Sequence, residues 1–194
     1  MKNYQLETDR IISSLSGTRP RLLLQSCCGP CSSYVLEYLT RFFAVTLLYY
    51  NPNIQPEAEY QKRLATQMQL LEHFPDVALL PCGYDGADYD EAVRGLESER
   101  EGGARCAVCF RLRLEMTARL AAKGGFDYFC TTLTVSPHKN AEVINGIGEE
   151  LAAQYGVGWL PSDFKKRDGY KRSLELSREY GLYRQSYCGC LFSK

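Results

Sequence analysis

The cysteines carry the most distinctive chemistry in this sequence. Seven of the nine fall in three closely spaced groups: Cys27, Cys28 and Cys31; Cys106 and Cys109; and Cys188 and Cys190. Two cysteines separated by two residues at the start of a helix face one metal ion, and the positive end of the helix favours the thiolate that metals bind. The spacing therefore indicates metal or redox chemistry.

Seven thiols exceed the four that one closed zinc or iron–sulfur site uses. They predict a cluster with either a second metal or a redox thiol pair, and Cys188 and Cys190 fit both. Structural zinc is the alternative, although its cysteines usually come as two spaced pairs and not as an adjacent Cys-Cys. A disulfide between Cys188 and Cys190 would need a strained ring. The isolated Cys82 and Cys130 are interpreted as small buried apolar side chains.

The segment that carries the first thiols is predicted to be a strand, a loop and a helix. The apolar run at residues 22–24 is too short for a buried helix, and Pro30 suits the first turn of one. Cys27 and Cys28 then lie at the carboxyl end of a strand, where parallel sheets bind ligands. Neither a GxxxxGK[ST] loop nor a GxGxxG loop is present, so a soft metal is expected there and not a nucleotide phosphate.

Strands and helices are predicted to alternate along the chain. Strands are expected at residues 21–26, 43–50, 76–81, 126–133 and 157–160, and helices at 30–41, 56–73, 105–123, 140–155 and 173–180, with an acidic loop or helix at 84–96. This order predicts a single α/β domain over residues 1–194, Rossmann-like, with a five-stranded, mostly parallel sheet flanked by helices in nucleotide alpha hydrolase-like layering. Residues 1–20 lack a secretory signal and no run approaches about 20 apolar residues, so we expect a cytoplasmic chain without a membrane partner.

Charge is balanced overall but unevenly distributed. Residues 76–101 hold eight acids and two arginines, whereas residues 163–194 hold eight bases, Lys194 among them, and four acids. Tyrosines and a phenylalanine alternate with those bases, which suits a single-stranded RNA loop whose phosphates meet cations and whose bases meet rings. A solvated helix face with inward tyrosines is the alternative. We expect the basic section 163–194 to pack near the cysteines.

Histidine is scarce, which narrows the acid–base chemistry. His73 ends a polar helix and is expected at the surface. His138 follows the fourth predicted strand, where it would face the site as a proton donor or RNA contact, or else cap the loop. The sequence contains no HExxH motif and no Ser/His/Asp set.

Taken together, the motifs resemble one family, the cobalamin-independent epoxyqueuosine reductases of the QueH type. The motifs that carry the resemblance are LQSCCGPCSS at 24–33, YNPNIQP at 50–56, Glu59-Tyr60 with Arg63, EREG at 99–102, RCAVCFRLRL at 105–114, TTLTVSPHKN at 131–140, DFKK at 163–166 and YRQSYCGC at 183–190. Two residues depart from the family pattern: Gln25, where histidine is common, and Gly29, where alanine is usual. Both leave the thiols in place.

The resemblance implies reduction of epoxyqueuosine to queuosine at the wobble position of a tRNA with a GUN anticodon, the last step of queuosine synthesis. It implies a [4Fe–4S] cluster beside a mononuclear metal, expected to be iron, an external electron donor, and all seven grouped cysteines as candidate ligands. The catalytic candidates are His138, Tyr183 and Asp168. The RNA-binding candidates are Lys139, Lys165, Lys166, Arg172 and Arg184. The pocket wall is expected to include Asn51, Asn53 and Ser136.

Two other functions fit parts of this pattern. A tRNA sulfur-transfer enzyme of this fold would activate tRNA with ATP, which requires the Gly-rich loop that is absent here. A zinc-stabilised RNA-binding module would be colourless and would accept no electrons.

Overall fold

The computed structural model describes residues 2–193, so Lys194 of the basic section lies outside the described residues. Its helices are Tyr4–Ser14 (α1), Gly29–Leu39 (α2), Glu57–Leu71 (α3), Gly86–Ala92 (α4), Ala104–Lys123 (α5), Ala141–Tyr155 (α6) and Gly169–Glu179 (α7), with short 3-10 turns at Leu133–Val135 (η1) and Leu191–Ser193 (η2). The strands are Arg21–Gln25 (β1), Ala44–Leu48 (β2), Ala78–Leu80 (β3), Tyr128–Thr131 (β4) and Gly158–Trp159 (β5).

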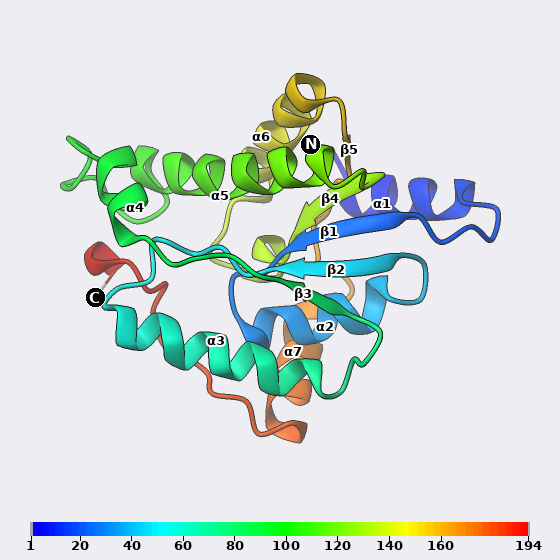
Figure 1. Cartoon of the computed structure of the whole chain (residues 1–194), viewed down its shortest axis with the longest axis horizontal. Coiled ribbons are helices and arrows are strands. Elements are labelled where there is room, and N and C mark those ends of the chain that lie inside the picture. Colours follow the sequence, from blue (N-terminus) through cyan, green and yellow to red (C-terminus); the bar gives the residue numbers. More distant parts are fainter. Residues whose placement is uncertain (1, 194) are drawn as a thin grey trace.

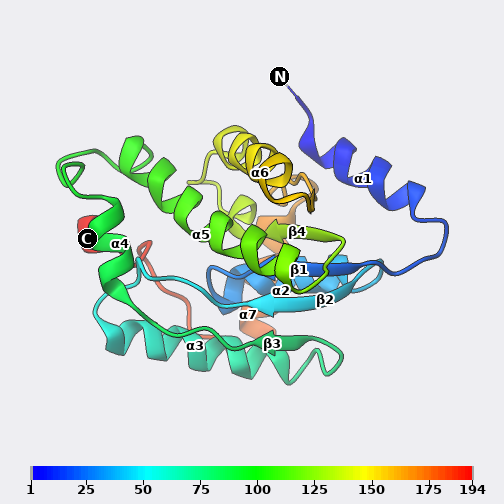
Figure 2. The same ribbon diagram turned by 45° about the horizontal axis from the view of Figure 1, so that its top comes forward.

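The strands form one sheet in the order β3-β2-β1-β4-β5, and every pairing is parallel. Parallel neighbours need a crossover connection, which the helices supply. Helices α5 and α6 cover one face of the sheet, and α2, α3 and α7 cover the other (Figures 1 and 2). The predicted layered α/β fold with five strands is confirmed.

Strand β1 lies in the middle of the sheet and divides the core. Its side chains alternate across the sheet, so Leu22 and Leu24 join the cluster under α2 and α3, whereas Leu23 joins the cluster under α5 and α6. All three are fully buried. A central strand buried on both faces explains the uninterrupted apolar run in the sequence.

Three local differences separate the structure from the predicted elements. No helix is predicted before residue 20, yet α1 forms there, with Asn3 capping its first turn. The last helix starts at Gly169, four residues before its predicted start, because only a glycine fits so near Phe164. Strand β4 ends at Thr131, and the chain then turns into η1. Among helices within residues 2–193, none is both long and apolar enough to cross a membrane.

Candidate metal centre

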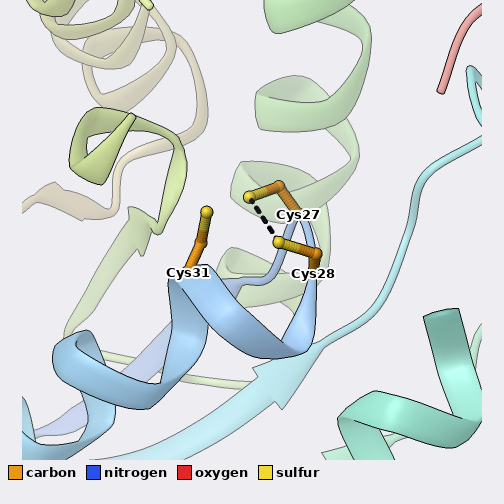
Figure 3. A group of neighbouring side chains, drawn as sticks. All are labelled: Cys27, Cys28 and Cys31. Carbon is orange, nitrogen blue, oxygen red and sulfur yellow. Dashed lines mark hydrogen bonds between the residues drawn. The ribbon is translucent and has the colours of Figure 1, made fainter. Parts of the chain in front are cut away.

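The first three cysteines meet where β1 ends and α2 begins (Figure 3). Cys28 is the residue before the helix, with an extended backbone, and Pro30 occupies the first turn. The three sulfur atoms of Cys27, Cys28 and Cys31 lie within 4.8 Å of one another, and those of Cys27 and Cys28 are 3.9 Å apart. We call these three residues the thiol triad. Among residues 2–193 it is the one group of three metal-ligating side chains this close together.

Polar side chains hold the loop beneath the triad. The fully buried Gln25 donates to the Ser26 and Tyr50 carbonyls at 2.9 and 3.2 Å and accepts from Thr131 at 2.7 Å. It thereby joins the carboxyl ends of β1, β2 and β4. Thr132 accepts from the Cys27 backbone N–H at 3.0 Å and donates to the Cys27 sulfur at 3.3 Å. The amide at position 25 satisfies strand ends that would otherwise be buried without partners.

Without a metal, the three thiols compete for one negative charge. The Cys27 and Cys31 thiols donate hydrogen bonds to the Cys28 sulfur and hold its pKa well below the usual thiol value, against the effect of burial. The same contact with Cys28 raises the pKa of Cys27 to about 12, and the pKa of Cys31 is raised by its contact with Cys27. These shifts favour the thiolate at Cys28 and the protonated thiol at Cys27 and Cys31, and a metal bound by all three must displace the remaining protons.

The other four grouped cysteines come from two distant parts of the chain. Cys106 and Cys109 lie in the first turns of α5, and Cys188 and Cys190 lie near the C-terminus. Cys109 and Cys190 share a small buried cluster with Tyr89 and Val93. Burial raises the pKa of the Cys109 thiol to about 11. Cys188 is the member of this second group that reaches the cavity of the triad.

Two cations, the buried Arg113 and the half-buried Lys139, lie among these thiols. Arg113 is 2% exposed and donates to the Cys109 sulfur at 3.4 Å, and Lys139 donates to the Cys188 sulfur at 3.0 Å. Burial lowers the pKa of each, but the neighbouring thiols outweigh burial and leave both pKa values raised. The nearest carboxylate to Lys139 is Glu101, at 3.9 Å. These cations favour anionic sulfur or another anion in the site.

A cavity of about 520 Å³ opens at the triad. Its lining includes the triad, Cys188 and the predicted residues Asn53, Ser136, His138, Lys139 and Arg184. The exposed His138 and the half-buried Lys139 also line a smaller neighbouring cavity of about 70 Å³, where Cys106 is found. The structure thus brings one catalytic candidate and two RNA-binding candidates together with the thiols. A volume of this size suits a nucleoside.

Two catalytic candidates lie away from that lining. Tyr183 hydrogen bonds through its hydroxyl to Glu59 at 3.2 Å, and its ring lies under Lys62 at 3.5 Å. Asp168 is exposed, in a left-handed backbone conformation just before α7. Neither is among the residues that line the 520 Å³ cavity.

Three RNA-binding candidates also lie outside the cavity lining. Lys165 pairs with Asp163 at 2.6 Å, and Arg172 pairs with Glu37 at 2.6 Å and Glu175 at 3.3 Å. Lys166 is exposed. Their contribution to binding RNA stays a prediction. Asn51, expected in the pocket wall, is buried and donates to the Ser26 carbonyl at 2.8 Å beneath the triad.

One functional residue that sequence reasoning left without a role is Arg63. It is 2% exposed, and its guanidinium donates to the Cys188 carbonyl at 3.0 Å, the Tyr187 carbonyl at 3.4 Å and the Glu59 carboxylate at 2.7 Å. A planar fork with several donors suits this task, and a lysine would not match it. The Glu59/Arg63 spacing of four residues in a helix was the available signal.

The donor set fits a thiolate-bound metal group. Three soft sulfur ligands lie at the mutual distances that a metal site needs, at a helix N-terminus, with the cations Arg113 and Lys139 nearby. Sulfur-only ligation is typical of iron–sulfur clusters and of zinc, and this geometry accommodates both.

Comparison with known proteins identifies the family of the chain. The family model described as epoxyqueuosine reductase QueH matches residues 22–194. Proteins named epoxyqueuosine reductase QueH are similar: one from Streptococcus pyogenes serotype M1 is 44% identical over 98% of this chain and 79% of its own length, and one from Staphylococcus epidermidis is 41% identical over 100% and 87%. The one from Thermotoga maritima is 38% identical over 89% of each chain.

Among solved structures, the fold resembles that of the U34-tRNA thiolase NcsA from Methanococcus maripaludis, determined with its [4Fe-4S] cluster. The TM-score is 0.55 and the identity 10%, over 98% of this chain and 67% of the thiolase. This likeness concerns the fold. The family model and the sequence identities carry the assignment, and the resemblance seen in the motifs is confirmed: the chain belongs to the epoxyqueuosine reductase QueH family.

Proposed function

We propose that the chain reduces epoxyqueuosine to queuosine at the wobble position of a tRNA with a GUN anticodon. The family assignment supports the reaction, and the observation that carries it is the thiol triad in the wall of a nucleoside-sized cavity. Two electrons from an external donor and two protons balance the reaction, because the epoxide oxygen leaves as water and the two carbon atoms gain a double bond.

In this proposal the triad would hold a [4Fe–4S] cluster. Its remaining ligand, and the ligands of an adjacent mononuclear iron, would come from the other four grouped cysteines, Cys106, Cys109, Cys188 and Cys190. The clustering of the sulfur atoms of Cys27, Cys28 and Cys31 supports the first assignment. When bound, a cluster supplies electrons singly and an open metal supplies a Lewis acid. The resemblance stated from the motifs is the basis for the second metal.

The remaining lining residues bind and orient the substrate. Lys139 and Arg184 place positive charge at the cavity, where RNA phosphates bind. His138 and Lys139 carry N–H groups in the same lining, and they are our candidates for delivering protons to the leaving oxygen. The other predicted residues lie outside this lining and would hold more distant parts of the tRNA: Tyr183, Asp168, Lys165, Lys166 and Arg172.

The test starts from protein purified without oxygen. Iron, sulfide and zinc are quantified, and dithionite-reduced protein is then given tRNA that carries epoxyqueuosine, with nucleosides identified by mass spectrometry. We expect brown protein with about four or five irons that bleaches on reduction, and conversion to queuosine. Colourless protein with zinc alone and no conversion would overturn the proposal in favour of an RNA-binding module. ATP hydrolysis with tRNA thiolation would overturn it in favour of sulfur transfer.

A further inference from the structure

Two residues of the cavity wall, Tyr170 and Leu174, have no role in the chemistry described above. Tyr170, Leu174 and Arg184 line the cavity together with the thiol triad. Tyr170 and Leu174 are four residues apart in α7, so they lie on one face of that helix. Arg184 comes from the segment that follows α7. A ring, an aliphatic side chain and a guanidinium thus share this part of the wall.

The position of Tyr170 is fixed by close packing at the start of α7. A Cβ on Gly169 would lie 1.8 Å from the Phe164 carbonyl oxygen and 2.4 Å from the Tyr34 ring. This contact sets the first turn of α7 tightly against α2, and the two helices pack against each other. Tyr170 is half-buried and packs on the core beneath the cavity. Its ring therefore has little freedom to lose when it binds a ligand.

Arg184 lies beside this ring. Its guanidinium carbon is 5.7 Å from the centre of the Tyr170 ring, and the side chain is exposed. Arg172, on the same helix as Tyr170, pairs with Glu37 and Glu175. Arg184, by contrast, forms no salt bridge with any of residues 2–193. Its charge and its planar group are both available to a ligand in the cavity.

We propose that Tyr170, with Arg184 beside it, is a stacking site for a nucleobase next to the wobble nucleotide of a single-stranded RNA loop. The inference rests on the proposed function and adds a second base to it. Aromatic rings and guanidinium planes are the groups on which unstacked RNA bases lie. A nucleotide that enters the cavity toward the triad leaves its neighbours unstacked, and a platform for one of them offsets that loss.

The test measures RNA binding without turnover. A fluorescent RNA stem-loop with an unmodified GUN anticodon is titrated into metal-loaded protein, and the anisotropy gives the Kd. Tyr170→Leu keeps an apolar side chain on the core but removes the ring, and Tyr170→Phe keeps the ring. Arg178→Ala, an exposed arginine of α7 outside the cavity lining, is the matched control. We expect Tyr170→Leu to weaken binding roughly tenfold, and Tyr170→Phe and Arg178→Ala to bind like the wild type.

A second RNA identifies the base. Stem-loops with an abasic nucleotide on one or the other side of the wobble nucleotide are bound to the wild type and to Tyr170→Leu. We expect one abasic site to weaken wild-type binding roughly tenfold and to weaken Tyr170→Leu binding little further. Arg184→Lys, which keeps the charge and removes the plane, should lose several-fold in affinity.

Equal binding by the wild type and Tyr170→Leu would overturn the stacking site, as would abasic losses that are the same in both proteins. If such a result came with full conversion of epoxyqueuosine by the wild type, the proposed function would stand without it. Loss of both conversion and stem-loop binding in the wild type would overturn the two together.

Discussion

The two groups of thiols in this protein are built in different ways. The triad lies within one strand-to-helix junction, and its three sulfur atoms come together through local backbone geometry (Figure 3). The second group joins the start of α5 to the C-terminal segment, and Arg63 and Lys139 hold Cys188 from other elements. One thiol site is therefore encoded by local sequence and the other by tertiary contacts.

The largest effect is expected at the triad, which we expect to be the principal metal site. Cys28→Ser removes its most buried ligand. Changes to outer-shell partners already cost about 10–100-fold in metal affinity, so loss of a ligand should exceed about 100-fold. We expect iron and sulfide in anaerobically purified protein to fall to background, together with conversion of epoxyqueuosine.

Cys82→Ser is the matched control, because Cys82 is half-buried and outside both cavity linings. It should keep the iron content of the wild type. A Cys28→Ser protein with its full iron and sulfide content would contradict the local assignment.

A second prediction concerns the protons on the triad. The raised pKa values of Cys27 and Cys31 favour protonated thiols near neutral pH, and the lowered pKa of Cys28 favours its thiolate. A metal bound by all three must displace about two protons, so its affinity should rise about 100-fold for each pH unit. Acid therefore weakens binding. Competition between metal-free protein and a chelator for Co²⁺ measures the dependence.

The matched variant is Cys31→Ser, which removes one of the two displaced protons. Its dependence should drop to about tenfold per pH unit. If the metal affinity of the wild type also changed only about tenfold per pH unit, two of its three thiols would already be ionised. That result would contradict the prediction of a single thiolate in the triad.

The local features of the molecule are those that could be read from the sequence. The five strands, the position of Cys27 and Cys28 at a strand end and the N-terminal turn at Pro30 depend on patterns only a few residues long. The buried interpretation of Cys130 is also confirmed, because it lies within β4 with no exposed surface.

The tertiary features could not be predicted in the same way. No spacing in the sequence shows that Lys139 contacts Cys188, or that Arg63 holds the Cys188 carbonyl from α3. The sequence alone also does not show that the Tyr183 hydroxyl, a catalytic candidate, hydrogen bonds to Glu59. The early start of α7 depends on the approach of Gly169 to Phe164, which is a contact between packed elements and not a helix signal.

The tertiary origin of the second group is tested at Arg63. Arg63→Lys keeps the charge beside Glu59 but cannot donate to the Tyr187 and Cys188 carbonyls together. Hydrogen bonds from charged groups contribute about 1.5–3 kcal/mol, so the segment around Cys188 should open at least roughly tenfold more often. In metal-free protein, alkylation of Cys188 followed by peptide mass spectrometry should accelerate by that factor.

The same experiment contains its own reference, because Cys31 lies in the triad and its alkylation rate should not change. Lys62→Arg, which keeps a cation over the Tyr183 ring, is the matched variant. Equal acceleration at Cys31 and Cys188 would mean that Arg63 stabilises the whole cavity and not the C-terminal segment.

The smallest expected effect is on stability, and it concerns the packing of α2 against α3 beside the triad. A Cβ on Gly29 would lie 3.0 Å from the Thr66 methyl carbon and 3.1 Å from the Thr66 carbonyl oxygen, and the latter belongs to the backbone of α3. Gly29→Ala should therefore lower the free energy of unfolding by about 1 kcal/mol, because an overpacked contact must displace one helix.

Gly146 in α6 has open space around it, so Gly146→Ala should instead stabilise the protein by up to about 1 kcal/mol through helix propensity. Urea unfolding of the metal-free variants measures both. A stabilised Gly29→Ala protein would show that α2 can shift away from α3. The contact between Gly29 and Thr66 would then not be what fixes the geometry of the triad.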